Sequence, residues 1–393
     1  MALQRLKRTA MMPGLLQKVA PRIYDPHISS GVLASASIIC QRGLKTYGNC
    51  LPILPMLESE PAQRKQVKNK HKERGGVSRA RRQSRKLSIA IIGAGRVGLA
   101  LGRAAQASGH GISLAIARTG ANARRASKLL GTAGVSLGTR AIDQLSSEHR
   151  GLLKQSNLLL IATPDDSISE VADQIARVFK TSRTDRRHSR RRVVALHTSG
   201  ALASDVLKPI RDQGVATGSL HPLVSISGAP QAPRTFAGVY FSVEGDAAAI
   251  RLGKQLVRDI DGNSFVINPD RKPLYHAAAL MASPNLTALI DIAVEMMSRC
   301  GFGSSEARKM LIPLIVSTID NLTLQDPRAA LTGTFKRGDI ATARIHLDAI
   351  ASERLTDAME AYVVLGRRSL KLSEISETKK RAIESLLKNA IKR

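Results

Sequence analysis

The residues best suited to proton chemistry lie on one predicted helix that starts near position 272. Lys272, Tyr275 and His276 are spaced i, i+3 and i+4, so a helix places their amine, phenol and imidazole on one face. A carbonyl or imine that accepts a hydride also needs a proton, which a desolvated lysine or a histidine can supply. The alternative is a lysine at the rim and a histidine satisfied in the core. We predict Lys272 and His276 as the proton-handling pair.

Two further residues are predicted to orient a substrate beside that helix. His197 and His221 each close a predicted strand, at the sheet edge where doubly wound folds build their sites. Of the two we predict His221 as the substrate contact, while a structural role stays open for either. Pro284 should kink or break the helix and free polar backbone beside Asn285, our second candidate, although a plain boundary between two packed helices is equally open.

A glycine-rich motif provides the predicted cofactor site. The apolar run that ends at Ile92 enters Gly93, Ala94, Gly95, Arg96, Val97 and Gly98 and continues as a helical pattern. Between a strand and a helix, the first glycine permits a tight turn, the second lets backbone approach a pyrophosphate and the third lets the helix pack on the strand. The alternative is a packing turn that binds nothing.

The end of the second predicted strand distinguishes between two nicotinamide cofactors. NAD sites carry Asp or Glu there for the ribose 2′-hydroxyl, whereas an arginine accommodates a 2′-phosphate. This chain has Arg118 and Thr119, with Arg124 and Arg125 close behind, so we predict NADP; a solvated arginine is the alternative. The nicotinamide is expected at the ends of the next two strands, near Ala162, Thr163, Pro164, Thr198 and Ser199.

The elements that must position these residues alternate between strand and helix over residues 87–268. This pattern predicts an α/β fold, with a doubly wound, Rossmann-like parallel sheet. The predicted strands are 87–92, 112–117, 158–162, 193–196, 215–220, 238–243 and 264–267, and the later helices are 168–179, 203–212 and 246–259. Strand signals vanish after Asn268, so residues 269–393 are predicted to form an all-helical domain, with helices at 272–299, 304–324, 340–365 and 373–392.

The N-terminal extension is strongly basic. Residues 1–86 hold 18 of the 60 Lys and Arg residues but only 4 of the 31 Asp and Glu residues, so they are expected to be disordered. The first 63 residues or so have a composition like that of a mitochondrial presequence, with a disordered tail or a wrongly chosen start codon as alternatives. Residues 64–86 contain no aromatic residue, so any contact with nucleic acid would be non-specific.

The composition also limits which metals, membranes and cellular locations are expected. The three cysteines have no metal-ligand or disulfide spacing, so we expect no metal. No uninterrupted apolar run approaches the roughly 18 residues of a membrane span, so no membrane partner is expected. The expected location is the cytoplasm, or the mitochondrial matrix if residues 1–86 include a presequence.

Five motifs carry a resemblance to a known family. Residues 87 to about 350 resemble the Rossmann-like proteins with the C-terminal domain of unknown function 2520, which are relatives of pyrroline-5-carboxylate reductase and of the 6-phosphogluconate dehydrogenase group. The motifs are IIGAGRVG at 91–98, HTSGA at 197–201, HPL at 221–223, KPLYHAAA at 272–279 and ALTGTFKRGD at 330–339.

The resemblance implies an NADP-linked oxidoreductase whose helical domain forms a homodimer and completes the cleft, with a substrate that the family leaves undefined. Lys272 falls where related hydroxyacid dehydrogenases place a catalytic lysine, and His276 falls where they have Asn. We therefore expect an NADP-dependent oxidoreductase that reduces a small carbonyl or imine compound. The alternatives are a non-catalytic NADP-binding regulatory protein and a polyanion-binding protein that uses its basic arm.

Overall fold

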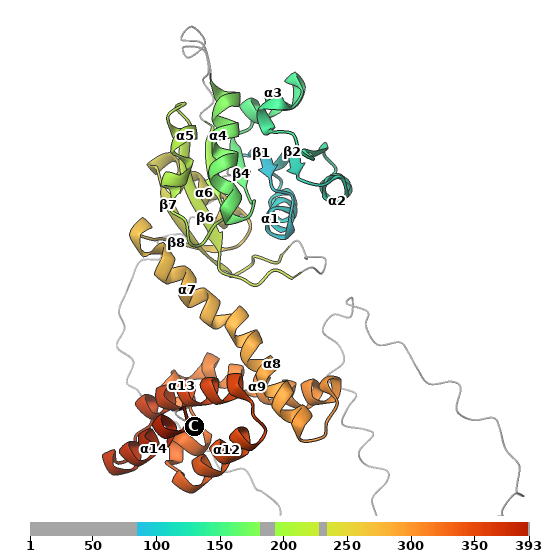
Figure 1. The fold of residues 1–393 in the computed structure, drawn as a ribbon. Helices are drawn as coiled ribbons and strands as arrows, with labels where there is room; N and C mark the ends of the chain where they lie inside the picture. The colour runs from blue at the N-terminus through green and yellow to red at the C-terminus, as the bar shows by residue number, and fades with distance from the viewer. Residues whose placement is uncertain (1–84, 181–192, 228–233, 392–393) are drawn as a thin grey trace, which may run out of the picture. The chain divides into compact units, whose positions relative to one another are not determined.

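The computed structural model describes residues 85–180, 193–227 and 234–391 (Figure 1). The prediction for the basic extension up to residue 84 lies outside these ranges and stays a prediction.

The described residues before position 268 form an eight-stranded sheet in the order β3-β2-β1-β4-β5-β6-β7-β8. The strands are β1 (Ser88–Ile92), β2 (Gly111–Ala117), β3 (Gly134–Ser136), β4 (Leu158–Ile161), β5 (Val194–His197), β6 (Ala216–Pro222), β7 (Tyr240–Gly245) and β8 (Asn263–Val266). The chain order reverses between β1 and β4, and such a switch point opens a crevice at the carboxyl ends of the strands. The predicted Rossmann-like α/β fold is confirmed.

Helices cover both faces of this sheet because successive strand residues point to opposite sides. On one face Ile89 and Ile91 pack with α1 (Arg96–Ala107), α2 (Gly120–Leu130) and α6 (Ala247–Asp259). On the other face Ala90 and Ile92 pack with α3 (Ser147–Gln155), α4 (Ile168–Phe179) and α5 (Lys208–Arg211). Two hydrophobic cores therefore hold the switch point rigid from both sides.

Several elements differ from the sequence predictions. Strand β7 runs antiparallel to β6, so the sheet is mostly rather than wholly parallel. The predicted helix over 203–212 is a short 3₁₀ turn, Ser204–Leu207, followed by α5. The 3₁₀ turn that starts at Pro269 is capped by Asn268, whose side chain accepts a hydrogen bond from the Asp270 N–H.

The rest of the described chain is helical, as predicted. A 3₁₀ turn, Pro269–Arg271, leads into α7 (Lys272–Ala282), and the break that Pro284 predicts separates it from α8 (Pro284–Arg299). The remaining helices are α9 (Ser304–Leu324), α10 (Pro327–Ala330), α11 (Gly333–Arg337), α12 (Ile340–Ser352), α13 (Thr356–Leu372) and α14 (Glu377–Ala390). The predicted single helix over 340–365 is wrong, because Arg354 takes a left-handed φ of 55° between α12 and α13.

One helical stretch, Pro269–Arg299, is long and apolar enough to cross a membrane by length and composition alone. Its most apolar window has a mean hydropathy of 1.5 and is not buried within the described part of the chain. Uninterrupted apolar runs in the sequence do not predict this stretch, because polar residues such as Ser283 and Asn285 are scattered through it.

Candidate active site

A cavity of about 440 Å³ opens at the β1–β4 switch point. Eight of the predicted cofactor residues line it: Gly93, Ala94, Gly95, Arg118, Thr119, Ala162, Thr163 and Pro164. They come from three loops, each at the carboxyl end of a parallel strand. The crevice predicted by the fold is therefore real and lined by the predicted loops.

The glycines of the motif differ in what surrounds them. Gly93 has a φ of +97°, and a Cβ there would lie 2.6 Å from the Ala162 backbone, so only glycine fits this turn. A Cβ at Gly98 would overlap the Gly93 carbonyl oxygen, which explains the close packing of α1. A Cβ at Gly95 would meet nothing within 4 Å. The cavity therefore leaves open space over Gly95, beside the unpaired N–H groups that a helix start presents.

Two arginines lie in the lining of the same cavity. Arg118 directly follows β2, and Thr119 is the N-cap of α2, where its hydroxyl accepts a hydrogen bond from Asn122 N–H at 3.3 Å. Arg140, which sequence reasoning missed, donates to the Ser136 carbonyl at 2.9 Å and lines the cavity as well. Nothing local marks Arg140, since the loop after β3 brings it there. The lining thus combines two guanidinium groups with the start of a helix.

Five predicted cofactor residues do not line this cavity: Arg96, Val97, Gly98, Thr198 and Ser199. The Thr163 hydroxyl oxygen, in a residue of this lining, is buried and has no hydrogen-bond partner. Open space over a glycine turn and a helix start fit a dinucleotide, whose phosphates would lie over Gly93 to Gly95.

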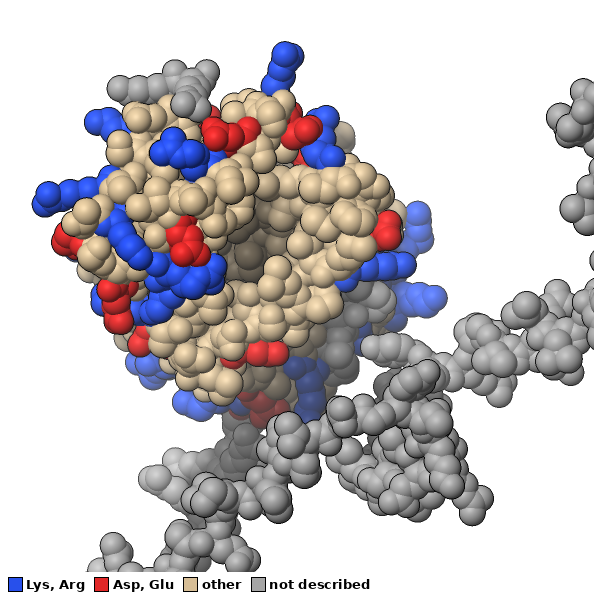
Figure 2. Space-filling model, turned by 90° about the horizontal axis from the view of Figure 1, so that it is seen from below, with Lys and Arg blue, Asp and Glu red and all other residues tan. Residues whose placement is uncertain are grey.

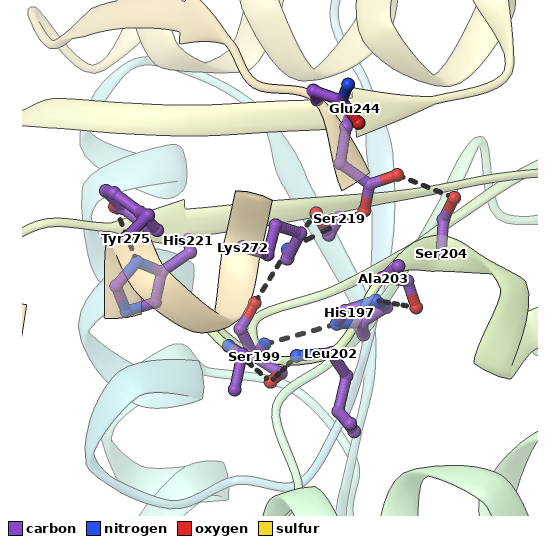
Figure 3. Close-up of polar contacts among 12 residues, drawn as sticks. His197, Ser199, Leu202, Ala203, Ser204, Ser219, His221, Glu244, Lys272 and Tyr275 are labelled. Atoms are coloured by element: carbon purple, nitrogen blue, oxygen red, sulfur yellow. Dashed lines mark hydrogen bonds and ion pairs between the residues drawn. The ribbon is translucent and has the colours of Figure 1, made fainter. Parts of the chain in front are cut away.

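Ser199 fixes the loop after β5 through all of its polar groups (Figure 3). Its hydroxyl donates to Asp165 Oδ2 at 2.7 Å and accepts the N–H groups of Ala201 and Leu202. Its own N–H donates to His197 Nδ1 at 3.2 Å. Because Asp165 directly follows Pro164, Ser199 ties the loop after β5 to the cofactor-lining loop after β4. It acts as a positioning residue.

Lys272 is buried, with none of its surface exposed (Figure 3). Its Nζ donates to the Ser199 carbonyl at 3.1 Å and to Ser219 Oγ at 2.5 Å, and it lies 3.6 Å from Glu244 Oε1. Burial lowers the pKa of Lys272 to about 8, although Glu244 opposes the shift. The amine therefore joins α7 to β6, β7 and the Ser199 loop. This geometry favours a positioning role over the predicted role of proton donor.

His197 is likewise buried and fully engaged. Since Nδ1 accepts the Ser199 N–H, the proton lies on Nε2, which donates to the Ala203 carbonyl at 3.3 Å. Burial lowers the pKa of His197 to about 3, so the ring is neutral at neutral pH. Of the two alternatives open for His197, the contacts favour the structural one.

Three aromatic side chains meet beside Gly200. Tyr275 Oη lies 2.8 Å from His221 Nδ1, and the His276 ring meets the His221 ring edge-on at 5.4 Å. A Cβ at Gly200 would overlap His276 Nδ1 and would lie 2.8 Å from His221 Nε2, so the HTSGA motif leaves room for both rings. His276 Nδ1 is buried without a hydrogen-bond partner. Burial, aided by His276 and Lys272, lowers the pKa of His221 to about 4.

These three side chains line a second cavity, of about 610 Å³, between β6 and α7. The predicted neighbour Asn285 does not line it: its amide donates to Met281 Sδ at 3.0 Å and is exposed. The structure thus brings His221 and His276 together, adds Tyr275, and leaves Lys272 and Asn285 outside. Among the described residues no group of three His, Cys, Asp or Glu side chains could hold a metal ion.

Comparison with known families agrees with this architecture. Residues 72–222 match the Rossmann-like domain, and residues 239–369 match the domain of unknown function DUF2520. The chain is a Rossmann-like protein with a DUF2520 domain. The first match contains β1 to β6, and the second begins just before β7 and ends within α13. No curated protein matches the sequence.

Solved structures resemble this chain at low sequence identity. A Bacteroides fragilis protein named "putative NADP oxidoreductase" is 17% identical, with a TM-score of 0.57, over 73% of this chain and 98% of its own. A Thermotoga maritima protein is 20% identical, with a TM-score of 0.48, over 77% and 98%. A Plasmodium falciparum pyrroline carboxylate reductase with NADP bound is 12% identical, with a TM-score of 0.45, over 78% and 97%. At these identities the likeness is one of fold.

Proposed function

We propose that this chain is an NADP(H)-dependent oxidoreductase that reduces a small carbonyl or imine compound. The observation that carries the proposal is the cavity at the β1–β4 switch point, with open space over Gly95 and with Arg118 and Arg140 in its lining. A glycine turn at a helix start suits a pyrophosphate, and an arginine after β2 suits a 2′-phosphate. The name of the B. fragilis protein, an NADP oxidoreductase, is of the same reaction class.

The second cavity supplies the groups for proton transfer. When bound, NADPH supplies the hydride. His276, with His221 and Tyr275 beside it, is the proposed source of the proton that the carbonyl oxygen or imine nitrogen takes up, because these side chains line the cavity. Lys272 and Ser199 hold the loop between the two cavities in place through the bond from Nζ to the Ser199 carbonyl.

Titration of the purified protein with NADPH and with NADH tests the proposal. We expect NADPH to bind at least about tenfold more tightly, which corresponds to roughly 1.4 kcal/mol from contacts to the 2′-phosphate. Screening keto acids, aldehydes, ketones and imines for NADPH oxidation then separates an enzyme from a non-catalytic NADP-binding regulator. A protein that binds neither nucleotide contradicts both.

We also propose a homodimer formed through the helical domain. Helix α9 has one buried residue, Ala307, while its exposed large apolar residues include Met310, Leu314 and Ile319. A helix whose large apolar side chains stay exposed is typical of a protein–protein interface. The face drawn in Figure 2 is mostly uncharged around a central hollow, with charged side chains toward its edges.

A further inference from the structure

We infer that the substrate carries no anionic group: it is an uncharged, largely apolar ketone or imine, bound with its one polar atom toward His276 and Tyr275. This inference rests on the proposed function and narrows its substrate class. It follows from the composition of the cavity between β6 and α7.

The lining of that cavity contains no arginine or lysine. Its volume of about 610 Å³ is in the range of small-molecule sites. The described residues that line it are apolar except for two serines and the aromatic cluster: His221, Pro222, Leu223, Val224, Ser225, Tyr275, His276, Ala278, Ala279, Leu280, Ala282, Ser283 and Pro284. An anion bound there would lose its water without gaining an arginine or a lysine.

Neither Lys272, which lies outside the lining, nor His221, which is part of it, supplies a positive charge to the cavity. Lys272 begins the helix that forms one wall, but it is fully buried and bonded to Ser199 and Ser219. His221 has a pKa lowered to about 4, mainly by burial, and is therefore uncharged at neutral pH. Neither group offers a counter-charge to a carboxylate.

The start of α8 also lacks the features of an anion site. Ser283 is its N-cap but makes no capping hydrogen bond through its side chain, and Pro284 has no N–H to donate. The amide groups that follow belong to Asn285 and Leu286, which do not line the cavity. A helix start alone therefore does not replace the missing cation.

The apolar wall suits an uncharged ligand. Leu223, Val224 and Leu280 line the cavity and are 43%, 37% and 41% exposed, so a ligand that covers them removes apolar surface from water. In the same lining, His221, Tyr275 and His276 lie close to one another, with Tyr275 Oη 2.8 Å from His221 Nδ1. A cavity with one polar cluster and apolar walls fits a molecule with one carbonyl or imine group.

Two matched pairs of compounds test the inference. Acetophenone carries a methyl group where phenylglyoxylate carries a carboxylate, and 2-methyl-1-pyrroline and 1-pyrroline-2-carboxylate differ in the same way. With NADPH and the full chain, kcat/KM for the better uncharged compound should exceed that of its carboxylate partner by roughly a hundredfold or more, since an unpaired buried charge is costly. Equal or greater turnover of the carboxylates overturns the inference and leaves the proposed reductase standing.

A binding measurement covers the case in which none of the four compounds turns over. Thermal shift of the NADP⁺ complex should increase with the uncharged compounds and stay unchanged with the carboxylates. Stabilisation by the carboxylates alone, or by none of the four, overturns the substrate class, whereas failure of NADPH itself to bind overturns the proposed function instead.

A variant that adds the missing cation makes the test sharper. Val224→Arg places a guanidinium group in the lining and should raise the ratio of carboxylate to uncharged binding by roughly tenfold. Val266→Arg, on β8 and 52% exposed, is the matched control because Val266 does not line the cavity, and it should leave the ratio unchanged. An equal effect of both variants, or no effect of Val224→Arg, contradicts the inference.

Discussion

Arg118 and Arg140 line the cavity at the β1–β4 switch point, where an acidic residue after β2 would favour NAD over NADP. Arg118→Ala should weaken NADPH binding roughly tenfold to a hundredfold, the scale of a charged hydrogen bond, while NADH binding changes little. Fluorescence titration with both nucleotides measures this. Arg251→Ala, an exposed arginine on α6 outside the cavity, is the control. Equal weakening of both nucleotides by Arg118→Ala contradicts a role in 2′-phosphate binding.

Lys272 and Glu244 form a buried ion pair, with Glu244 also accepting a hydrogen bond from Ser204 at 2.7 Å. Lys272→Met leaves the carboxylate buried without its cation and should lower the free energy of unfolding by about 3–5 kcal/mol. The double variant Lys272→Met, Glu244→Gln removes both charges, keeps an acceptor for Ser204, and should recover most of that loss. Urea unfolding measures both. Normal stability of Lys272→Met together with lost turnover would restore the role of proton donor.

The buried histidines make stability depend on pH. Burial lowers the pKa values of His197 to about 3 and His221 to about 4, below the value of 6.5 expected in the unfolded chain. Because the unfolded state takes up these protons first, the stability present above pH 6.5 is lost as the pH falls toward 4 and 3. At pH 5 the loss is about 2 kcal/mol for each histidine. Urea unfolding at pH 7 and at pH 5 should show this loss of unfolding free energy, and about half of the loss should disappear in His197→Asn. An unchanged loss in the variant contradicts the lowered pKa of His197.

The turn between β1 and α1 is the element that separates cofactor binding from folding. A Cβ at Gly95 or at Gly303, before α9, meets nothing within 4 Å, so neither Gly95→Ala nor Gly303→Ala should change the unfolding transition by more than about 1 kcal/mol. Gly95→Ala alone should weaken NADPH binding, by roughly tenfold or more, because the methyl group enters the space assigned to the pyrophosphate. Calorimetric titration with NADPH compares the two; unchanged affinity in Gly95→Ala places the phosphates elsewhere.

Local sequence patterns predicted those elements whose boundaries have local causes. Helices α4 and α9 begin and end at the predicted residues, and the α7–α8 break follows from Pro284. The orientation of β7 could not be predicted, because alternation along a strand says nothing about its neighbour's direction. The turn at Arg354 has neither glycine nor proline to mark it.

The same limit applies to the candidate site. The glycine motif and Arg118 were found because their meaning is local, whereas Arg140 enters the cavity from a loop that no motif marks. The spacing of Lys272, Tyr275 and His276 correctly put them on one helix. It could not show that Glu244 and Ser219, on two strands of the sheet, would bury the lysine and leave the tyrosine and the histidine at the cavity. Residues far from this helix in the sequence therefore determine which of its three polar side chains line the cavity.

At the scale of the whole molecule, the exposed apolar side chains of the C-terminal helices are the feature that a single chain leaves unexplained. Leu314 on α9 is 64% exposed, and Ile319 and Leu322, further along the same helix, are 47% and 48% exposed. Water is a poor environment for so many apolar side chains on one helix, and a second copy of the helical domain would cover them. A homodimer of this kind buries α9 without any change to the sheet.

Leu314→Glu should therefore shift the protein from dimer to monomer, because a charge in the centre of an apolar interface is desolvated without a partner. Val364→Glu on α13, where the valine is 60% exposed, is the matched control and should keep the wild-type mass. Light scattering coupled to size-exclusion chromatography measures the mass of both variants. NADPH titration of the monomeric variant should give an unchanged affinity, because the residues that line the cavity at the β1–β4 switch point all belong to the sheet domain. A wild-type protein that is already monomeric contradicts the dimer. A protein that requires detergent to stay in solution also contradicts it, and indicates instead that Pro269–Arg299 contacts a membrane.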